Sequence, residues 1–420
     1  MKKLISILLA VALIASLAGC GASQKEEAAE TPAAEAPAAE APAEATAAEA
    51  EAEPIRIAFI GSMTGDDEIY GYVSGGAMEM AVEQINAAGG VAGRQIDLHV
   101  YDDRGDGVEA VNCARKAILD DKCVAIITAS STTGLISINS VLEEYKVPCI
   151  AYAIGAELIT KDEQGNTRPY MFRVNTTANQ CTTLIGKYAA DVLGYSTAAI
   201  FYDVSQSTGA DGVTYFTNGF ESEGGKVVEV EAYNAGDVDF RAQLSKLKNN
   251  GGFELIYSAA KYRELGLMAN QIKEIGLETQ LVGDRSWMML DVFQVAGDNL
   301  EGSVFPSDID FNDPKYDEFN AEFQERFDVH PGVAVGTDAY CVMDACLVLW
   351  NAIEHAVEDT GVISGETIHD AIEKYTTDFE AFTATISISP ETHNVRRPMG
   401  IFEIRDQNFV LVDNYDVSFG

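Results

Sequence analysis

Apolar and polar positions alternate along the first half of the chain in a pattern that predicts strands and helices in turn. The segment 75–87 carries apolar residues at helical spacing and ends at Gly89-Gly90, which favours a helix that stops there. Strands are expected at 55–60, 95–101, 124–128, 147–152 and 172–174, with helices at 75–87, 108–120 and 135–145. Because helices separate successive strands, the pattern predicts βαβ units around a parallel sheet.

The same rhythm restarts after residue 174 and predicts a second parallel sheet. Its expected strands are 198–202, 227–232, 255–258 and 280–283, and its expected helices are 179–193, 212–223, 240–249 and 265–275. The last third of the chain favours helices at 315–327, 337–358 and 366–375, then alternating runs at 382–389 and 399–412 that are typical of antiparallel edge strands. The fold class expected is therefore α/β, with two doubly wound parallel-sheet lobes.

Length and charge narrow the class of protein. The chain has 420 residues, enough for two or three domains, and its 66 acidic against 28 basic side chains give a net charge of −38. Nucleic-acid binding is excluded as the main function, because phosphate contacts need clustered Lys and Arg. The same charge argues against docking on anionic lipid head groups. No apolar run after the first twenty residues is long enough to span a membrane.

The N-terminus has the composition of an export segment. Lys2 and Lys3 precede the apolar run 4–14 and a mostly small-residue stretch, which favours a signal peptide over residues 1–19. Its end, Leu-Ala-Gly-Cys, resembles the bacterial lipobox, so Cys20 is the expected site of lipidation; the alternative is an ordinary cleaved signal. Residues 20–53 are then a lipidated Cys and a tether of Ala, Glu and Pro, too polar to order itself.

Cysteine spacing and catalytic motifs give no indication of an enzyme. The remaining cysteines lack the CxxC and Cys/His spacings of zinc or redox sites, so no metal and no cofactor are expected. Cys113 and Cys123 are close enough in sequence for a disulfide, although buried free thiols are an equal alternative. The GxGxxG and P-loop patterns are absent. The histidines occur outside any GxSxG or HExxH context. They are His99, His330, His355, His369 and His393.

Several short motifs, in order along the chain, resemble a known family. Those near the start are Ile60-Gly61-Ser62-Met63-Thr64-Gly65, Tyr70-Gly71, Gly76-Ala77 and the run from Ala81 to Arg94; later ones are Tyr101-Asp102-Asp103, Met171-Phe172-Arg173-Val174, Asp237-Val238-Asp239-Phe240, Gln271 to Leu277 and Asp338-Ala339-Tyr340. Together they resemble the leucine/isoleucine/valine-binding proteins, which are type I solute-binding components of ABC importers. The resemblance covers residues 54–420.

This resemblance implies two lobes that close on a small ligand, an amino acid or an organic acid. The N-terminal lobe would comprise 54–174 plus 305–388 and the C-terminal lobe 175–304 plus 389–420, with crossovers near Val174, Val304 and Ser389. The implied partners are an ABC permease and its ATPase, and the implied location is outside the cytoplasm, anchored to the bacterial membrane through Cys20. A ligand-sensing ectodomain is the alternative, because one fold serves both purposes.

In the first lobe, the positions that match the family's binding site are polar or small. Ser130, Ser131 and Thr132, with Thr133, follow a strand and open a helix, where hydroxyls and backbone N–H groups suit a carboxylate; the alternative is a plain N-cap. Tyr70 either lines the cleft or packs in its loop. The remaining matching positions are Ala153 and Gly155, after the next strand, and Thr208 in the second lobe. Gly155 lacks the Thr hydroxyl of the relatives, and the second-lobe position lacks their aromatic residue.

Two departures from the family bear on the ligand. After the strand 255–258 the chain has Lys261 and Tyr262, and Arg285 occupies the position where relatives carry an acid that holds the ligand's ammonium. A one-residue shift would restore Asp284 as that acid. An unpaired buried ammonium costs on the order of several kcal/mol, whereas Arg suits a carboxylate. The sequence therefore favours a ligand that is anionic or lacks an ammonium, unless Lys261 and Arg285 are merely solvated at the surface.

Overall fold

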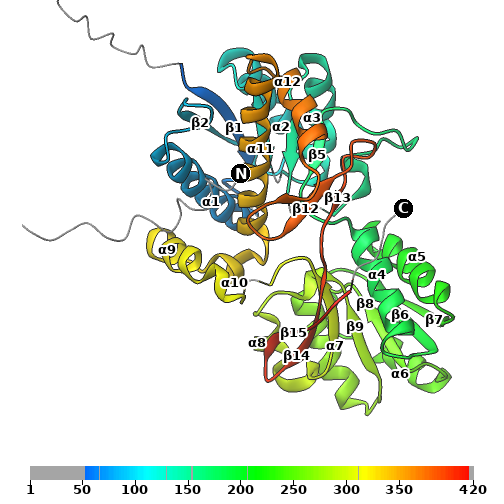
Figure 1. Ribbon diagram of the computed structural model, residues 1–420. Helices are drawn as coiled ribbons and strands as arrows, with labels where there is room; N and C mark the ends of the chain where they lie inside the picture. The colour runs from blue at the N-terminus through cyan, green and yellow to red at the C-terminus, as the bar shows by residue number, and fades with distance from the viewer. Residues whose placement is uncertain are drawn as a thin grey trace, which may run out of the picture. The chain divides into compact units, whose positions relative to one another are not determined.

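The computed structural model describes residues 53–415 apart from 66, 129, 153–154, 206 and 311, and it contains two parallel-sheet lobes (Figure 1). Among these residues, no helix is both long enough and apolar enough to cross a membrane. The six cysteines in this part of the chain, Cys113, Cys123, Cys149, Cys181, Cys341 and Cys346, are free thiols. The disulfide considered between Cys113 and Cys123 is therefore not formed.

The first sheet has five parallel strands in the order β2-β1-β3-β4-β5. Its strands are β1 (Ile55–Gly61), β2 (Ile96–Asp102), β3 (Ala125–Thr128), β4 (Cys149–Ala151) and β5 (Met171–Arg173). The helices between them are α1 (Glu68–Ala87), α2 (Gly107–Arg115), which continues into the π-helical turn Lys116–Asp120, and α3 (Thr132–Tyr145). Every predicted strand of this sheet is present, within two residues at each end.

The second sheet has seven strands in the order β15-β14-β10-β9-β8-β6-β7, of which β14 and β15 are antiparallel. The parallel strands are β6 (Thr197–Asp203), β7 (Lys226–Tyr233), β8 (Leu255–Ser258), β9 (Gln280–Gly283) and β10 (Val304–Ser307). The helices are α4 (Ala178–Asp191), α5 (Ser207–Ser222), α6 (Arg241–Asn250), α7 (Tyr262–Glu274) and the short α8 (Val292–Ala296).

Each sheet is covered by helices on both faces because successive strand residues point to opposite sides. In β1, Phe59 packs in the cluster that contains residues of α1, whereas Ile60 packs in the cluster that contains residues of α2 and α3. In β6, Phe201 and Ile200 divide in the same way between the α6–α7 side and the α4–α5 side. The predicted doubly wound α/β architecture is confirmed.

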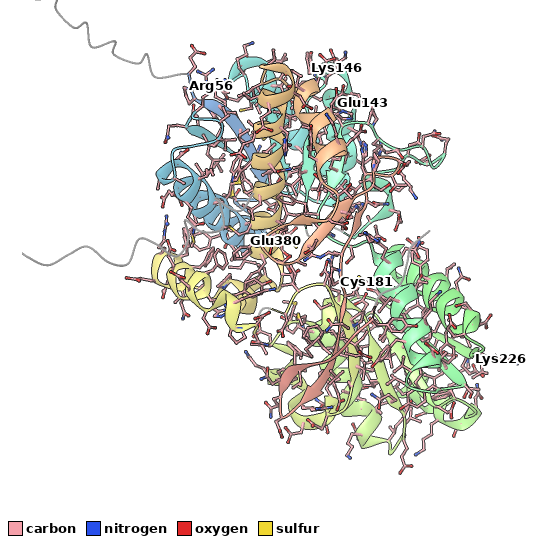
Figure 2. The ribbon with its side chains drawn as sticks, viewed as in Figure 1. Arg56, Glu143, Lys146, Cys181, Lys226 and Glu380 are labelled. Atoms are coloured by element: carbon pink, nitrogen blue, oxygen red, sulfur yellow. The ribbon has the colours of Figure 1, made fainter. Side chains whose placement is uncertain are left out.

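The last third of the chain supplies more helices and a small third sheet. The helices are α9 (Asp317–Phe327), α10 (Pro331–Val335), α11 (Asp338–Thr360) and α12 (Gly365–Tyr375), and the antiparallel sheet consists of β11 (Phe379–Glu380), β12 (Thr385–Ile388) and β13 (Val395–Arg396). Helix α11 is largely buried and packs on α1. The ion pair Lys146–Glu366, 2.6 Å between Nζ and Oε1, joins α3 to α12; Figure 2 labels Lys146.

Two elements differ from the sequence predictions. Helix α1 begins at Glu68 rather than at residue 75, so Tyr70 lies in its first turn and not in a loop. The run 399–412 is a hairpin of β14 (Gly400–Arg405) and β15 (Asn408–Asn414), because Asp406 and Gln407 adopt positive φ angles of 51° and 55° and reverse the chain. The polar run from Arg405 to Asn408 interrupts the alternation here, but it lacks the Asn-Gly or Asp-Gly pair typical of tight hairpins.

Strands of the sheets extend a few residues beyond two of the three crossover positions predicted, whereas β5 ends at Arg173, next to the crossover expected near Val174. Strand β10 keeps the chain in the second sheet as far as Ser307, beyond the crossover expected near Val304. Strand β13 pairs with β12, so the chain still lies in the third sheet at Arg396, beyond the crossover expected near Ser389. Short strands at a lobe boundary pair according to tertiary contacts that a local pattern does not contain.

Candidate functional site

The loops after β1, β2 and β3 meet at the carboxyl edge of the first sheet. Ser131 Oγ accepts a hydrogen bond from Gly134 N and donates one to Gly105 O, both at 3.2 Å. Gly105 N in turn donates to Asp103 Oδ1, which also accepts from Ser62 Oγ. Ser131 is therefore the N-cap of α3, as the plain alternative stated, and it also holds the β2–α2 loop against the start of that helix.

Thr132 and Ser130 flank this cap in different environments. Thr132 is half-buried at the first position of α3, where backbone N–H groups have no partner inside the helix and attract anions. Ser130 is fully buried, and its Oγ has no hydrogen-bond partner among the described residues. A solute can therefore approach the Thr132 side of the helix start but not the hydroxyl of Ser130.

Tyr70 lies within electrostatic range of residues from two other parts of the chain. Partial burial raises its pKa, and so do the nearby Asp338 at the start of α11 and Tyr262 at the start of α7. Tyr70 follows β1 of the first sheet, whereas Tyr262 follows β8 of the second. Residues that follow strands of the two sheets therefore lie near each other here, and open parallel sheets bind ligands at the carboxyl ends of their strands.

Asp338 is an acidic residue of this site that the sequence analysis did not single out as a candidate. It is half-buried, and burial raises its pKa to about 7, against the opposing attraction of Arg285. At neutral pH it is therefore poised between a carboxylate and a carboxylic acid. The sequence offered only its place in the Asp338-Ala339-Tyr340 motif, and nothing local marked it as buried beside an arginine.

Arg285 forms a buried ion pair. Its Nη1 lies 3.4 Å from Asp308 Oδ2, and the two side chains are 18% and 0% exposed. The pKa of Asp308 is lowered to about 2, because the attraction of Arg285 and Arg397 outweighs its burial. The alternative of a solvated surface position does not hold for Arg285, because burial and an acidic partner fix it in the interior.

Asp284 and Lys261 occupy different surroundings from Arg285. Asp284 Oδ1 accepts from Ser286 N at 2.9 Å and caps the 3-10 turn Arg285–Trp287, and burial raises its pKa. Its charge also raises the pKa of Tyr257, a residue of the second lobe's own core. Lys261 is exposed and makes no ion pair with any described residue, as the surface alternative expected. Of the two residues in the Gly283-Asp284-Arg285 segment, Arg285 is the one that influences the pKa of Asp338.

Of the remaining candidates, the structure describes a contact of Gly155, the backbone position of Thr208, and nothing of Ala153 and Cys20. Gly155 O accepts from Ala178 N at 2.8 Å, so this carbonyl contacts the start of α4. Thr208 lies in the first turn of α5, and its side chain is not described. Ala153 and Cys20 lie outside the described residues.

A cavity and a histidine cluster lie outside the group formed by Tyr70, Tyr262 and Asp338. A cavity of about 270 Å³ lies between the third sheet and the β14–β15 hairpin and is lined by Asp378, Thr385, Ser387, Arg396, Arg397, Pro398, Met399, Asn414 and Tyr415. None of these is a predicted ligand residue, and none belongs to the Tyr70–Asp338 group. In the described part of the chain, one group of side chains has the composition of a metal site, namely His369, Glu373 and His393. The sequence analysis predicted no metal.

Residues 54–408 match the family model of the periplasmic binding proteins. The chain is 34% identical over 256 residues to the leucine-, isoleucine-, valine-, threonine- and alanine-binding protein of Pseudomonas aeruginosa, a match that covers 60% of this chain and 66% of the relative. The chain thus spans slightly less than two thirds of that relative's length.

Two solved structures share the fold. A leucine-binding protein of Thermotoga maritima superposes with a TM-score of 0.69 at 26% identity, covering 86% of this chain and 99% of the other. A solute-binding protein of Rhodopseudomonas palustris, in complex with 3,4-dihydroxybenzoic acid, gives 0.70 at 23% identity and covers 86% of this chain and 97% of the other. One fold thus serves an amino acid in one protein and an aromatic acid in another.

Proposed function

Because the chain belongs to the periplasmic binding protein family, we propose that it is the extracytoplasmic solute-binding component of an ABC importer of the branched-chain amino acid type. The observation that carries this is that Asp338 and Tyr262 lie within electrostatic range of Tyr70, since Tyr70 follows a strand of the first sheet and Tyr262 a strand of the second. A solute bound there would contact both lobes and favour their closed arrangement, which the permease would recognise. The family is one of binding proteins, which supports the expectation that the chain is not an enzyme.

The proposed lobes follow the strand pairings. The N-terminal lobe comprises 54–174 with the segment that follows Ser307 up to Arg396, and the C-terminal lobe comprises 175–307 with the remainder after Arg396. Cys20 is the proposed lipid anchor, and residues 20–53 the tether. Mass spectrometry of the N-terminal peptide tests the anchor: a diacylglyceryl mass on Cys20 is expected, and an unmodified N-terminus at any other residue would contradict it.

The proposed ligand is a small carboxylate, and its anionic group binds at the start of α3. Thr132 and the first backbone N–H groups of that helix provide uncompensated donors and a positive dipole end. Ser131 supports this site by capping the helix and fixing the neighbouring loop. Ser130 is left out of the proposed contacts because it is fully buried.

The opposite end of the ligand meets Tyr70, Tyr262, Arg285 and Asp338, and this set favours an organic acid over an α-amino acid. Where relatives carry the acid that holds an ammonium, this chain has Arg285. Asp338 does not decide between the two, because a group with a pKa of about 7 ionises readily beside an ammonium and stays protonated beside an anion. The preference for an organic acid therefore rests on Arg285, whose positive charge would oppose a buried ammonium.

Calorimetric titration of the full chain tests both the solute-binding function and the proposed class of ligand. The panel contains leucine, isoleucine and valine, then benzoate, hydroxybenzoates and aliphatic mono- and dicarboxylates. We expect micromolar or tighter binding of a carboxylate without an ammonium. We expect it to weaken by at least about tenfold in Arg285→Met, because a charge-assisted contact is lost. Arg263→Met, which removes an exposed arginine from the same region, is the matched control.

Two outcomes would count against the proposal. Micromolar binding of leucine that is lost in Ser131→Ala but unchanged in Arg285→Met would overturn the organic-acid ligand while leaving the solute-binding function in place. Failure to bind any small solute in the panel, with turnover of one of them instead, would overturn the solute-binding function itself.

A further inference from the structure

His369, Glu373 and His393 come together from two separate parts of the chain. His369 and Glu373 are four residues apart on α12 and so share one face of that helix, and His393 lies in the turn between β12 and β13. Each offers one ligand atom, and the three atoms lie within 4.8 Å of one another. The group is partly screened from solvent, with side-chain exposures of 14%, 32% and 2% respectively.

The hydrogen bonds of the two imidazole rings determine which nitrogens face inward. His393 Nδ1 lies 3.1 Å from Arg168 O and 3.2 Å from Met171 O, and a backbone carbonyl is only an acceptor, so Nδ1 carries the proton. His369 Nδ1 lies 2.9 Å from the carboxylate of Asp370, which assigns its proton in the same way. A neutral imidazole has one N–H group, so both Nε2 atoms present lone pairs.

Both lone pairs point at the same carboxylate oxygen. Glu373 Oε1 lies 3.0 Å from His393 Nε2 and 3.5 Å from His369 Nε2. Three electron-pair donors at these distances repel one another unless a cation lies between them. That cation is either a metal ion or a second proton on one of the rings, and the test below distinguishes the two.

We propose that His369, Glu373 and His393 bind a divalent transition-metal ion, with Zn²⁺ the best match to two imidazoles and one carboxylate. The distances from Glu373 Oε1 to the two Nε2 atoms, 3.0 and 3.5 Å, bracket the separation of about 3.3 Å that bonds of 2.0–2.1 Å give around a tetrahedral ion, and all three ligand atoms lie within 4.8 Å of one another, so small side-chain shifts would complete the site. The Nδ1 partners of both rings are those that orient metal-ligating histidines in general. A water molecule would complete the coordination.

Surrounding contacts assign the ion a structural role. Phe172 stacks on His393 with ring centroids 4.1 Å apart, and His393 O accepts from Arg173 N at 3.2 Å. The ion would therefore connect α12, the end of β5 and the turn before β13. Because β5 and β13 precede two of the crossovers between the sheets, it would stiffen the base of those connections on the first lobe's side. This inference is independent of the identity of the transported solute.

The test uses the full chain after treatment with a chelator, with ZnCl₂ as the probe and MgCl₂ as the negative control. We expect one Zn²⁺ per chain, a rise in the midpoint of thermal unfolding, and a loss of affinity of at least about 100-fold in His369→Gln and in Glu373→Gln, since even second-shell changes cost 10- to 100-fold. His355→Gln is the matched control, because His355 also pairs with a glutamate on a helix, Nδ1 to Glu358 Oε2 at 2.9 Å, without a second histidine.

Co²⁺ provides a readout that does not depend on the stability of the variants. The wild-type chain with one equivalent of Co²⁺ should show the intense visible absorption of a low-symmetry site with few water ligands. No stoichiometric Zn²⁺ binding, equal loss in His355→Gln and Glu373→Gln, or a metal-free protein in which His393 Nε2 is protonated at neutral pH by NMR would each overturn the proposal.

Discussion

Arg397 and Asp308 are fully buried, and their hydrogen bonds join the three connections between the two sheets. Arg397 Nη2 donates to Asp308 O at 3.3 Å, and Nη1 donates to Val174 O at 3.0 Å. Asp308 Oδ2 accepts from Thr176 N at 3.2 Å and pairs with Arg285. One carboxylate therefore contacts both the hinge segments and the arginine of the candidate ligand site, so changes at either place should be felt at the other.

Removal of the Asp308 charge should strongly destabilise the fold. Asp308→Asn leaves Arg285 and Arg397 buried with less negative charge around them, and breaking a buried pair costs about 3–5 kcal/mol. Urea unfolding followed by tryptophan fluorescence measures this loss. Asp120→Asn, at an exposed acidic residue, should change the free energy of unfolding by less than about 0.5 kcal/mol. Equal midpoints for the two variants would contradict the prediction.

The titration of Asp338 should make stability fall as pH rises. Folding raises its pKa from 3.8 to about 7, so the folded chain binds more protons than the unfolded chain between these values. The stability associated with the protonated form is present below pH 3.8 and is lost as pH rises through 7. Asp338→Asn should therefore flatten the stability profile across this window, as measured by urea unfolding at several pH values. If the slope of unfolding free energy against pH were the same in Asp338→Asn and the wild type, the raised pKa of Asp338 would be refuted.

The number of protons that Asp338 takes up or releases on ligand binding should depend on the charge of the ligand. An ammonium placed beside Asp338 would lower its pKa and release protons near pH 7, whereas an anion would raise the pKa and cause proton uptake. Calorimetry in buffers of different ionisation enthalpy measures the number of protons exchanged. We expect uptake in the wild type and none in Asp338→Asn. Proton release by the wild-type chain would instead indicate a cationic group at this end of the site.

Alanine substitutions at two adjacent serines should differ in effect, with only Ser131→Ala lowering the free energy of unfolding. Ser131→Ala removes the N-cap of α3 and should destabilise the fold by about 1 kcal/mol. Ser130→Ala removes a buried hydroxyl without a partner among the described residues and should be neutral or stabilising by up to about 1 kcal/mol. Thermal unfolding of the two variants side by side checks this. A larger loss for Ser130→Ala would show that its hydroxyl has a partner.

Gly283 should not tolerate a side chain. A Cβ at this position would lie 2.0 Å from Trp287 Cε2, and Trp287 is fully buried, so Gly283→Ala must displace the indole and overpack the core by about 1–3 kcal/mol. Gly212→Ala is the control, because its nearest neighbour would lie at 3.4 Å. Loss of stability in Gly212→Ala alone would contradict the prediction.

The sequence predicted the order of strands and helices well, because that order is encoded locally. The strand expected at 280–283 is β9 with the same bounds, and the alternation of Phe59 and Ile60 between two helical layers follows from the twofold period of a strand. The turn inside 399–412 was missed because Asp406 and Gln407 are not a typical turn pair for it. Two of the three crossover positions were missed because short strands there pair through distant partners.

The candidate site was only partly predictable. Arg285 and Tyr262 were identified through their positions after strands, which is a property of the sequence register. The contact of Arg285 with Asp308 and its electrostatic interaction with Asp338 could not be predicted, because those acids lie 23 and 53 residues further along the chain than Arg285. The proximity of His369 and His393 could not be predicted for the same reason, because these residues lie on different elements.

The sequence by itself determined the α/β class, the two-lobe organisation and the family, because hydrophobic period and short motifs act over a few residues. Only the tertiary structure decided which side chains form ion pairs and which polar groups are buried. Arg285 is paired rather than solvated, Ser130 is buried rather than presented to a ligand, and two histidines face one glutamate. Electrostatic energies depend on distance and burial in space, and residues far apart in sequence acquire both only when the chain folds.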